Sequence, residues 1–206
     1  EENEKRLAAL NETSEVISQS LELDEVLESA MTSVQEVMGV KAVRIYIKDE
    51  AEGVLRLVAH RGVSDTFVAG VCVIRLGEGF NGRVAMTGEP MYVEDASEDP
   101  RLTREVVRQE NIHSQIIVPM TAKGKVVGTI AAAMHTHRRF LPREIELLTA
   151  IANQIGVAVD NARLYREQKA VAEALRVSEQ RYRGLFENAH DAIWVHDLDD
   201  RLIAAN

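Results

Sequence analysis

The chain has 206 residues, of which 46% are apolar and 28% charged, and its formal net charge is −9. This length and apolar fraction predict one large domain, or one domain with part of another. The negative charge argues against a nucleic-acid or anionic-membrane partner, because both attract a positive field.

Two further features bear on location. No apolar run approaches the ~20 residues that cross a bilayer, and the single cysteine excludes an internal disulfide. We therefore expect a cytoplasmic protein, and no membrane contact by these 206 residues. The first residue is not Met, so we expect a fragment of a longer protein.

The N-terminal stretch predicts two helices. The first, over residues 3–20, carries a heptad seam with one polar insertion, formed by Leu7, Leu10, Ser14, Ile17 and Leu21. The second is expected to begin with Asp24 as its N-cap and to end at Gly39. Its apolar face is predicted to comprise Val26, Leu27, Ala30, Met31, Val34, Val37 and Met38.

Antiparallel strands are predicted next. In residues 43–48 and again in residues 54–59, every second side chain is apolar, and a turn separates the two stretches. This pattern predicts an antiparallel hairpin with one buried face. Short strands are expected at 71–76 and 91–94, followed by a polar loop at 95–100 and a helix near 103–109. A clear hairpin joins 114–121 to 125–134 through Lys123 and Gly124. Its second strand is apolar on both faces, which predicts a central position in the sheet.

A long helix is predicted from Pro142. Its first part is apolar nearly all round, more than one sheet can cover, so a partner helix is expected. Further along, a coiled-coil seam predicts a dimer, with apolar members Leu164, Val171, Leu175, Tyr182 and Leu185 and polar members Gln168 and Ser178. Residues 189–206 then predict a strand, a polar turn at 197–200 and a second strand.

Residues 77–90, GEGFNGRVAMTGEP, have the glycine spacing of a phosphate loop. Gly77 and Gly82 stand at the P-loop gap, but no lysine follows them, and no parallel βαβ unit surrounds the G-x-G-x-x-G match. We interpret the stretch as a tight turn and a short helix over 81–86, ended by Gly88. Such a helix would cover one side of the sheet.

Side chains with metal or redox chemistry are few. His135 and His137 would share one side of a strand, but no nearby cluster joins them, so an exposed basic turn and no metal site are predicted. His113 is interpreted as a partly buried histidine that faces a pocket rather than as a haem ligand. The apolar neighbours of Cys72 predict a structural thiol. No activated nucleophile stands out, so no catalytic site is expected.

Several motifs then occur in the order of a known family. They are L-G-E-G-F-N-G-R-V-A-M-T-G-E-P, P-x-L-T, I-H-S-Q-I-I-V-P-M, G-K-V-V-G-T-I and A-N-Q-I-G-V-A-V-D-N-A-R-L-Y. Together they resemble a GAF domain. The resemblance implies an α+β fold, a central antiparallel sheet with helices on both faces, flanked by long terminal helices. The family's ligand pocket, by position, would involve Phe80, Val84, Met86, Met91, His113, Gln115 and Ile117.

The tail from Ser178 to Asn206 is similar to the start of a PAS domain, although a glycine is usual near Asp200 in that family. The expected organisation is a signalling helix at 1–20, a GAF domain at 21–168, a helical linker or coiled coil at 169–187 and an incomplete PAS start at 188–206. The resemblance implies a bacterial sensory protein of the two-component type. Its output domain would be a histidine kinase or a diguanylate cyclase.

The resemblance implies a sensory module that detects a small molecule or a partner and passes the signal through the terminal helices of a homodimer. A ligand-free dimerisation or spacer module is an open alternative, and so is a haem or cyclic-nucleotide sensor. Residues 134–140, MHTHRRF, lack the family's cyclic-nucleotide pattern, and Cys72 comes earlier than its tetrapyrrole-binding cysteine. The sequence assigns no cofactor.

Overall fold

The computed structural model describes residues 23–96, 98–102, 104–187, 194–196 and 202–205. These residues fall in two compact units that divide between Ala162 and Arg163. The helix predicted over 3–20, with its seam, lies outside the described residues. Over the described ranges, no helix combines the length and apolarity needed to cross a membrane. The cytoplasmic location stays a prediction.

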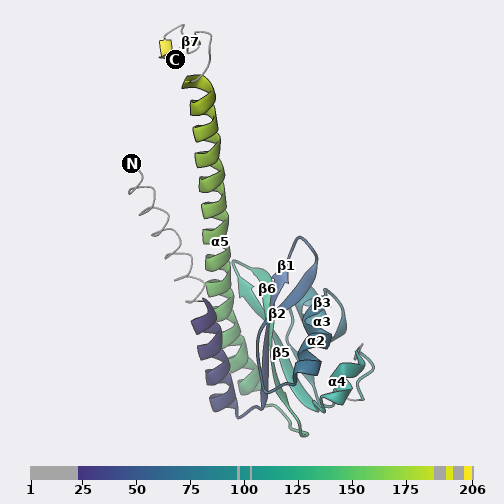
Figure 1. The fold of residues 1–206 in the computed structure, drawn as a ribbon. Helices are drawn as coiled ribbons and strands as arrows, with labels where there is room; N and C mark the ends of the chain where they lie inside the picture. The colour runs from purple at the N-terminus through teal and green to yellow at the C-terminus, as the bar shows by residue number, and fades with distance from the viewer. Residues whose placement is uncertain (1–22, 97, 103, 188–193, 197–201, 206) are drawn as a thin grey trace. The chain divides into compact units, whose positions relative to one another are not determined.

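A six-stranded antiparallel sheet forms the centre of the first unit, in the order β3-β2-β1-β6-β5-β4 (Figure 1). Its strands are β1 (Ala42–Asp49), β2 (Val54–Arg61), β3 (Val73–Arg75), β4 (Met91–Val93), β5 (Ser114–Ala122) and β6 (Lys125–Met134). The turn between β5 and β6 has φ of 49° at Lys123 and 76° at Gly124, the left-handed pair that a tight hairpin requires. The predicted α+β fold is confirmed.

Helices cover both faces of the sheet (Figure 1). The helix over residues 23–38 and the first part of α5 (Pro142–Glu187) pack on one face, here called the long-helix face. The opposite, short-helix face is covered by α2 (Asp65–Val71), α3 (Gly79–Thr87) and α4 (Glu105–Gln109). The two faces hold separate apolar cores.

The long-helix face contains the partner helix that the sequence predicts for α5. The helix over 23–38 and α5 meet the strands in one cluster that includes buried Leu27, Met31, Val34, Met38, Leu148, Ala152, Ile155 and Val159. Two details of the prediction are wrong. Val26 and Val37 are 39% and 66% exposed. Asp24 lies inside the helix rather than at its N-cap, because Leu23 is already helical.

β1 is buried on both faces, whereas the sequence predicts one buried face for its hairpin. Arg44 and Tyr46 are 2% and 0% exposed, because β1 lies between β2 and β6 and the short helices cover its second face. Successive side chains of β1 therefore point alternately into the two apolar cores. Along β2 the predicted pattern holds in part, since Arg56, Val58 and His60 are exposed.

α2 is a helix that the sequence analysis misses. It begins after Ser64, whose hydroxyl oxygen accepts a hydrogen bond from the Phe67 N–H at 3.2 Å, as an N-cap does. Phe67 and Val71 are buried beneath it. A helix of 7 residues is too short to show a periodic apolar pattern.

Residues 77–90 form the predicted turn, helix and turn. α3 runs from Gly79 to Thr87 and ends at Gly88, whose φ of 73° is left-handed. Gly82 lies against the preceding strand, where a Cβ would stand 2.3 Å from the carbonyl oxygen of Arg75. The glycine therefore allows α3 to pack directly on the end of β3.

The turn between β5 and β6 lies against α5. A Cβ on Gly156 would stand 2.6 Å from the carbonyl oxygen of Thr121, so the missing side chain permits this approach. The Thr121 hydroxyl donates to Oδ1 of Asn153 at 2.6 Å. Lys123 Nζ lies 3.1 Å from a carboxylate oxygen of Asp160, whose side chain is 6% exposed. These contacts fix one point of α5 against the sheet.

The second unit contains the rest of α5 and an antiparallel pair, β7 (Trp194–His196) and β8 (Leu202–Ala205). The two predicted strands are thus present, and the turn predicted at 197–200 lies outside the described residues. Four members of the predicted seam are 60–69% exposed, namely Val171, Leu175, Tyr182 and Leu185. Leu164 is partly buried. The seam and the dimer stay predictions.

Candidate functional site

A small cavity lies on the short-helix face of the sheet. Its volume is about 30 Å³, room for about two water molecules. The walls come from β1 and β5 of the sheet, from α2 and α3, and from the segment around α4. Its polar lining consists of Arg44, Tyr46, Glu78, Asn81, Arg104 and Gln115.

Arg44 brings a buried positive charge to this cavity. Its NH2 donates to Oε1 of Gln115 at 2.7 Å, and its guanidinium carbon lies 5.2 Å from the centre of the Phe67 ring. Burial lowers the pKa of Arg44, against the opposing influence of Tyr46 and of Glu110. Among the residues that the structure describes, no carboxylate pairs with Arg44 within ion-pair distance, and its Nε has no hydrogen-bond partner.

Two more buried donors share this environment. The Tyr46 hydroxyl and Nε2 of Gln115 have no hydrogen-bond partner in the described part of the chain, and both residues line the cavity. Burial raises the pKa of Tyr46, so its phenol keeps its proton at neutral pH. A buried polar group without a partner costs about 1–3 kcal/mol. Three such donor groups around one cavity favour a guest that supplies acceptor atoms.

Arg104 closes the cavity from the side of α4. Its Nε donates to Oε1 of Glu78 at 2.8 Å and its NH1 to the carbonyl oxygen of Gly70 at 2.6 Å. The hydrogen bond from Arg104 is the main cause that lowers the pKa of Glu78. α4 itself has no buried residue. The wall formed by α4 is therefore held by these polar contacts at its N-terminal end and by the partly buried Val106 and Val107, which pack against the apolar cluster of this face.

The structure places the predicted pocket residues at different depths. Phe80 and Gln115 line the cavity. Val84 and Ile117 are buried in the apolar cluster of the same face, and Met91 packs against that cluster. Which of these residues contacts a ligand stays a prediction.

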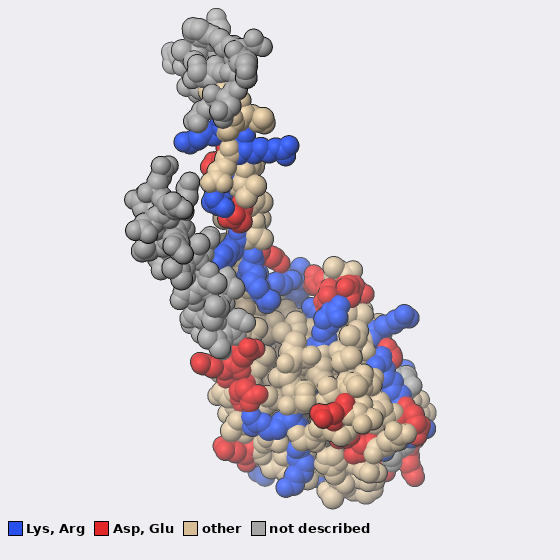
Figure 2. All heavy atoms as spheres, viewed as in Figure 1, with Lys and Arg blue, Asp and Glu red and all other residues tan. Residues whose placement is uncertain are grey.

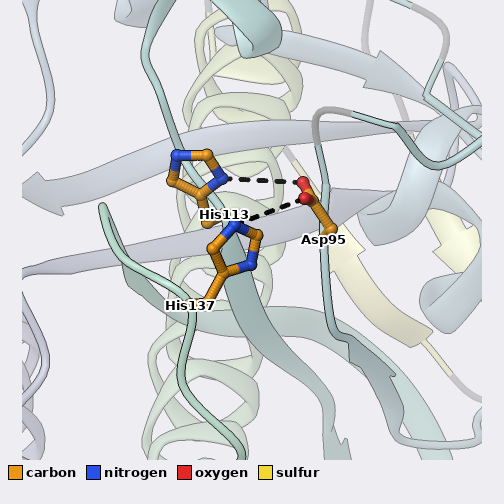
Figure 3. Close-up of side chains that lie close together, drawn as sticks. All are labelled: Asp95, His113 and His137. Carbon is orange, nitrogen blue, oxygen red and sulfur yellow. Dashed lines mark ion pairs between the residues drawn. The ribbon is translucent and has the colours of Figure 1, made fainter.

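Met86 and His113 lie outside the cavity lining. Met86 is 64% exposed on α3. His113 lies beyond the start of β5, close to Asp95 and His137 (Figure 3). The sequence predicts no cluster around His135 and His137, whereas in the structure Asp95 and His113 lie beside His137; the expected absence of a metal stays a prediction. The ring nitrogens of His135 instead face the carbonyl oxygens of Glu110 and Gly62, at 3.1 and 3.3 Å.

The environment predicted for Cys72 is also wrong. Cys72 is exposed at the C-cap of α2, where its thiol donates to the carbonyl oxygen of Ala69 at 3.5 Å. Val71 and Ile74 are 2% and 7% exposed and turn inward on either side of it. Apolar neighbours in the sequence therefore did not bury the thiol.

Sequence reasoning misses the polar residues that define the cavity, above all Arg44 and Tyr46. Their signal is present but ambiguous, because polar residues that alternate along a strand read as a solvent face. The aromatic ring and the long guanidinium stem were the available hint, since both side chains have apolar bodies that tolerate burial. Arg104 lies in a loop that gives no periodic signal.

The match to a family model decides the classification. Residues 20–160 match the model of the family described as "GAF domain". The chain belongs to the GAF domain family. The fold agrees with solved GAF structures, among them the GAF domain of a phosphoenolpyruvate-protein phosphotransferase from Coxiella burnetii. That structure superposes with a TM-score of 0.63 at 20% identity, over 77% of this chain and 98% of the other.

Several relatives of this chain are named as regulatory proteins. The chain is 28% identical over 181 residues to the "Nif-specific regulatory protein" of Azospirillum lipoferum, and the aligned region covers 84% of this chain and 29% of that protein. A solved domain of a putative two-component sensor histidine kinase from Sinorhizobium meliloti 1021 is 26% identical, with a TM-score of 0.60 over 71% of this chain and 97% of the other. The chain spans about a third or less of the length of the curated relatives it matches.

Charged side chains outside the cavity show no obvious segregation in the view of Figure 2. Acidic and basic groups are interspersed on the face that it presents. The expected absence of a nucleic-acid partner stays a prediction.

Proposed function

We propose that this GAF domain is a regulatory sensor module that binds a small anionic molecule at the Arg44 cavity. The observation that carries the proposal is a buried guanidinium that no carboxylate pairs with in the described ranges, next to the donors of Tyr46 and Gln115, which are unpartnered over the same ranges. A carboxylate or phosphate oxygen would offset the buried charge and accept from these donors. The names of the regulatory relatives support a sensory role for the module.

A guest larger than a few atoms requires the cavity to widen, because about 30 Å³ holds little more than water. We propose that α4 moves to admit it. α4 has 5 residues and none is fully buried, so its displacement breaks the contacts of the partly buried Val106 and Val107 and of no fully buried side chain. The bonds from Arg104 to Glu78 and to Gly70 would break on opening and re-form on closure.

The strands offer a direct route from the cavity to the terminal helices. Arg44 and Gln115 face the cavity, whereas their chain neighbours Val43, Ile45 and Ile116 belong to the core of the long-helix face. A guest that shifts β1 or β5 therefore moves side chains that contact the helix over 23–38 and α5. We propose that the signal leaves the domain as a shift of these helices.

The first experiment looks for the guest itself. Native mass spectrometry of protein purified from its own host should show a retained small anion. A panel of small carboxylates and phosphates should include compounds that raise the melting temperature of the wild type. Arg44→Met should abolish both the retained mass and the thermal shift. Arg56→Met is the matched control, because Arg56 is an exposed arginine on the neighbouring strand β2, and it should keep both.

The ligand-free spacer is the second candidate, and the small volume of the cavity favours it. A wild type that retains no molecule and responds to no compound in the panel would support the spacer and contradict the sensor. For haem, the cavity offers no histidine, since His113 lies outside its lining. A Soret band after haem reconstitution would instead support a haem sensor. Cyclic nucleotides belong in the same panel.

We propose that the apolar seam on α5 joins two copies of the chain. Val171, Leu175, Tyr182 and Leu185 are 60–69% exposed and recur at heptad spacing. Leu164→Asp combined with Leu175→Asp should convert a dimer to a monomer in sedimentation. Val177→Asp, at an exposed apolar position off the seam, should leave the mass unchanged. A wild-type monomer at high micromolar concentration would contradict the proposal.

We propose that β7 and β8 begin a PAS domain. The antiparallel pairing of Trp194–His196 with Leu202–Ala205 supports this, as do the similar residues of the tail. In a chain extended through the following segment, amides of this hairpin should exchange far more slowly than in the present chain. Equal exchange in both would contradict a PAS domain. For the output domain, likeness to the Sinorhizobium meliloti protein supports a histidine kinase, and the relatives named as Nif regulators support another regulatory output.

A further inference from the structure

Three side chains that could bind a metal gather at one end of the sheet (Figure 3). Nδ1 of His113 lies 3.6 Å from Oδ1 of Asp95, and Nε2 of His137 lies 3.6 Å from Oδ2 of the same carboxylate. All the candidate ligand atoms lie within 4.8 Å of one another. The two imidazole rings are tilted against each other with their centres 4.4 Å apart.

The register of the sheet brings these distant residues together. Val93, at the end of β4, pairs with Gln115, and Ser114, at the start of β5, pairs with Met134, at the end of β6. Asp95 therefore follows β4, His113 precedes β5 and His137 follows β6 at the same end of three neighbouring strands.

Hydrogen bonds then fix the three segments to one another. The buried hydroxyl of Ser114 donates to the carbonyl oxygen of Glu94 and accepts from the backbone N–H of Arg138, each at 2.8 Å. The Ala96 N–H donates to the carbonyl oxygen of His113 at 2.7 Å. Each candidate ligand is thus a direct neighbour of a residue in this network, so the backbone presents the three side chains in a fixed arrangement.

A simple ion pair describes this geometry poorly. A charged imidazole beside a carboxylate closes to a hydrogen bond of about 2.7–3.2 Å, whereas both separations are 3.6 Å. Nδ1 of His113 is buried without a hydrogen-bond partner in the described part of the chain. Nδ1 of His113 and Nε2 of His137 both face the carboxylate of Asp95 (Figure 3), so a cation between them would meet two nitrogens and one carboxylate.

We propose that Asp95, His113 and His137 bind a divalent first-row transition metal. Two histidine nitrogens and one carboxylate suit Zn²⁺ and its neighbours in that row. Ligands bound at about 2.1 Å around a tetrahedral ion lie about 3.4 Å from one another. Each histidine nitrogen lies 3.6 Å from a different oxygen of Asp95, and one ligand atom from each residue lies within 4.8 Å of the others, so the three side chains would close slightly around the ion. The His137 side chain is 65% exposed, so water has access to the remaining coordination positions.

The site lies next to a contact that joins both helices of the long-helix face. Arg138 follows His137, and its NH1 donates to the carbonyl oxygen of Met38 at 2.7 Å while its NH2 donates to Oε1 of Glu144 at 2.6 Å. A metal that immobilises His137 therefore also restrains the residue that links the helix over 23–38 to the start of α5. None of the three proposed ligands lines the Arg44 cavity.

The experiment titrates tag-free protein with Zn²⁺ in an isothermal calorimeter, in a Cys72→Ser background that removes the exposed thiol as a competing ligand. We expect one Zn²⁺ per chain. His137→Ala, His113→Gln and Asp95→Asn should each weaken binding at least ~10-fold. His60→Ala is the matched control, since His60 is an exposed histidine on β2, and it should bind like the background protein. Visible absorption with Co²⁺ gives a second readout of the same set.

His137→Ala keeps the test valid if the more buried variants fail to fold, because the His137 side chain is 65% exposed and its partners among the described residues are the Asp95 carboxylate and the His113 ring. Circular dichroism should show that this variant is folded. Stoichiometric binding that is lost in His137→Ala and kept in His60→Ala would support the site. No stoichiometric Zn²⁺, binding that survives His137→Ala, or equal loss in His60→Ala would each overturn it.

Discussion

The two faces of the central sheet are built from the same strands but have different interiors. The core of the long-helix face is an apolar cluster formed by the helix over 23–38, α5 and one side of β1, β5 and β6, and the buried polar residue of α5 is Asp160, paired with Lys123. The short-helix face combines an apolar cluster with buried Arg44, Asn81 and Gln115. The long-helix face therefore stabilises the fold, whereas the buried polar groups of the short-helix face lower its stability at the place where a guest is proposed to bind.

The largest effect should come from the long-helix face. Leu148→Ala removes a side chain that is 0% exposed and should lower the free energy of unfolding by about 3 kcal/mol, because it leaves a cavity. Urea denaturation measures this loss. Leu147→Ala, one position away and 37% exposed, should cost less than ~1 kcal/mol. Equal losses in the two variants would mean that α5 packs on the sheet in another orientation.

The rigid part of the short-helix face should respond next. Gly82→Ala places a Cβ against the Arg75 carbonyl oxygen and should destabilise the domain by about 2 kcal/mol through overpacking. Thermal and urea unfolding give the value. Gly184→Ala is the control, because nothing lies within 4 Å of an added Cβ on this helical glycine, and alanine is the better helix former. A neutral Gly82→Ala would show that α3 does not pack closely on β3.

Arg44 offers the sharpest contrast between the two faces. Arg44→Met keeps most of the side-chain volume and removes a buried charge, so it should change the free energy of unfolding by no more than about 1 kcal/mol, in either direction. The same variant should lose the proposed guest. A loss of stability as large as that of Leu148→Ala would show that Arg44 stabilises the fold. It would contradict the proposal that the buried polar groups of the short-helix face are there to bind a guest.

The smallest effect concerns the polar contact that holds α4. The Arg104 hydrogen bond lowers the pKa of Glu78, so its stabilisation is present above the ordinary glutamate pKa, about 4.3, and is lost as the pH falls through the lowered value. Glu78→Gln should therefore cost less than ~1 kcal/mol at neutral pH and nothing in acid. Urea midpoints at both pH values test this, with the exposed Glu89→Gln as control. A difference that persists in acid would point to packing.

The sequence predicts most elements of the fold, because turns and periodic apolar patterns are local signals. The β5–β6 hairpin follows from Lys123-Gly124 between apolar runs, and α3 follows from the glycines around it. α2 escapes because it is too short for periodicity. Its N-cap Ser64 is a signal, but one serine does not distinguish a helix from a turn.

The candidate site is less accessible to sequence reasoning. Arg44 and Tyr46 alternate with apolar residues as a solvent face would, and only the order of the strands shows that β1 lies centrally under the short helices. Asp95, His113 and His137 are separated by long stretches of chain, so their meeting depends on the register of β4, β5 and β6. A resemblance to the family supplied Phe80 and Gln115, which line the cavity.

The contact of Gly156 with Thr121 sets the rotational phase of α5. Each residue of an α-helix turns the next side chain by about 100°, so within the first unit the side chains of α5 up to Ala162 take their directions from this point. The same angle governs the proposed seam in the second unit. One residue inserted between Val171 and Leu175 would turn Leu175 away from the line of Leu164 and Val171, whereas seven residues would nearly restore that line. We expect the proposed dimer to tolerate insertions in the seam only in steps of seven residues.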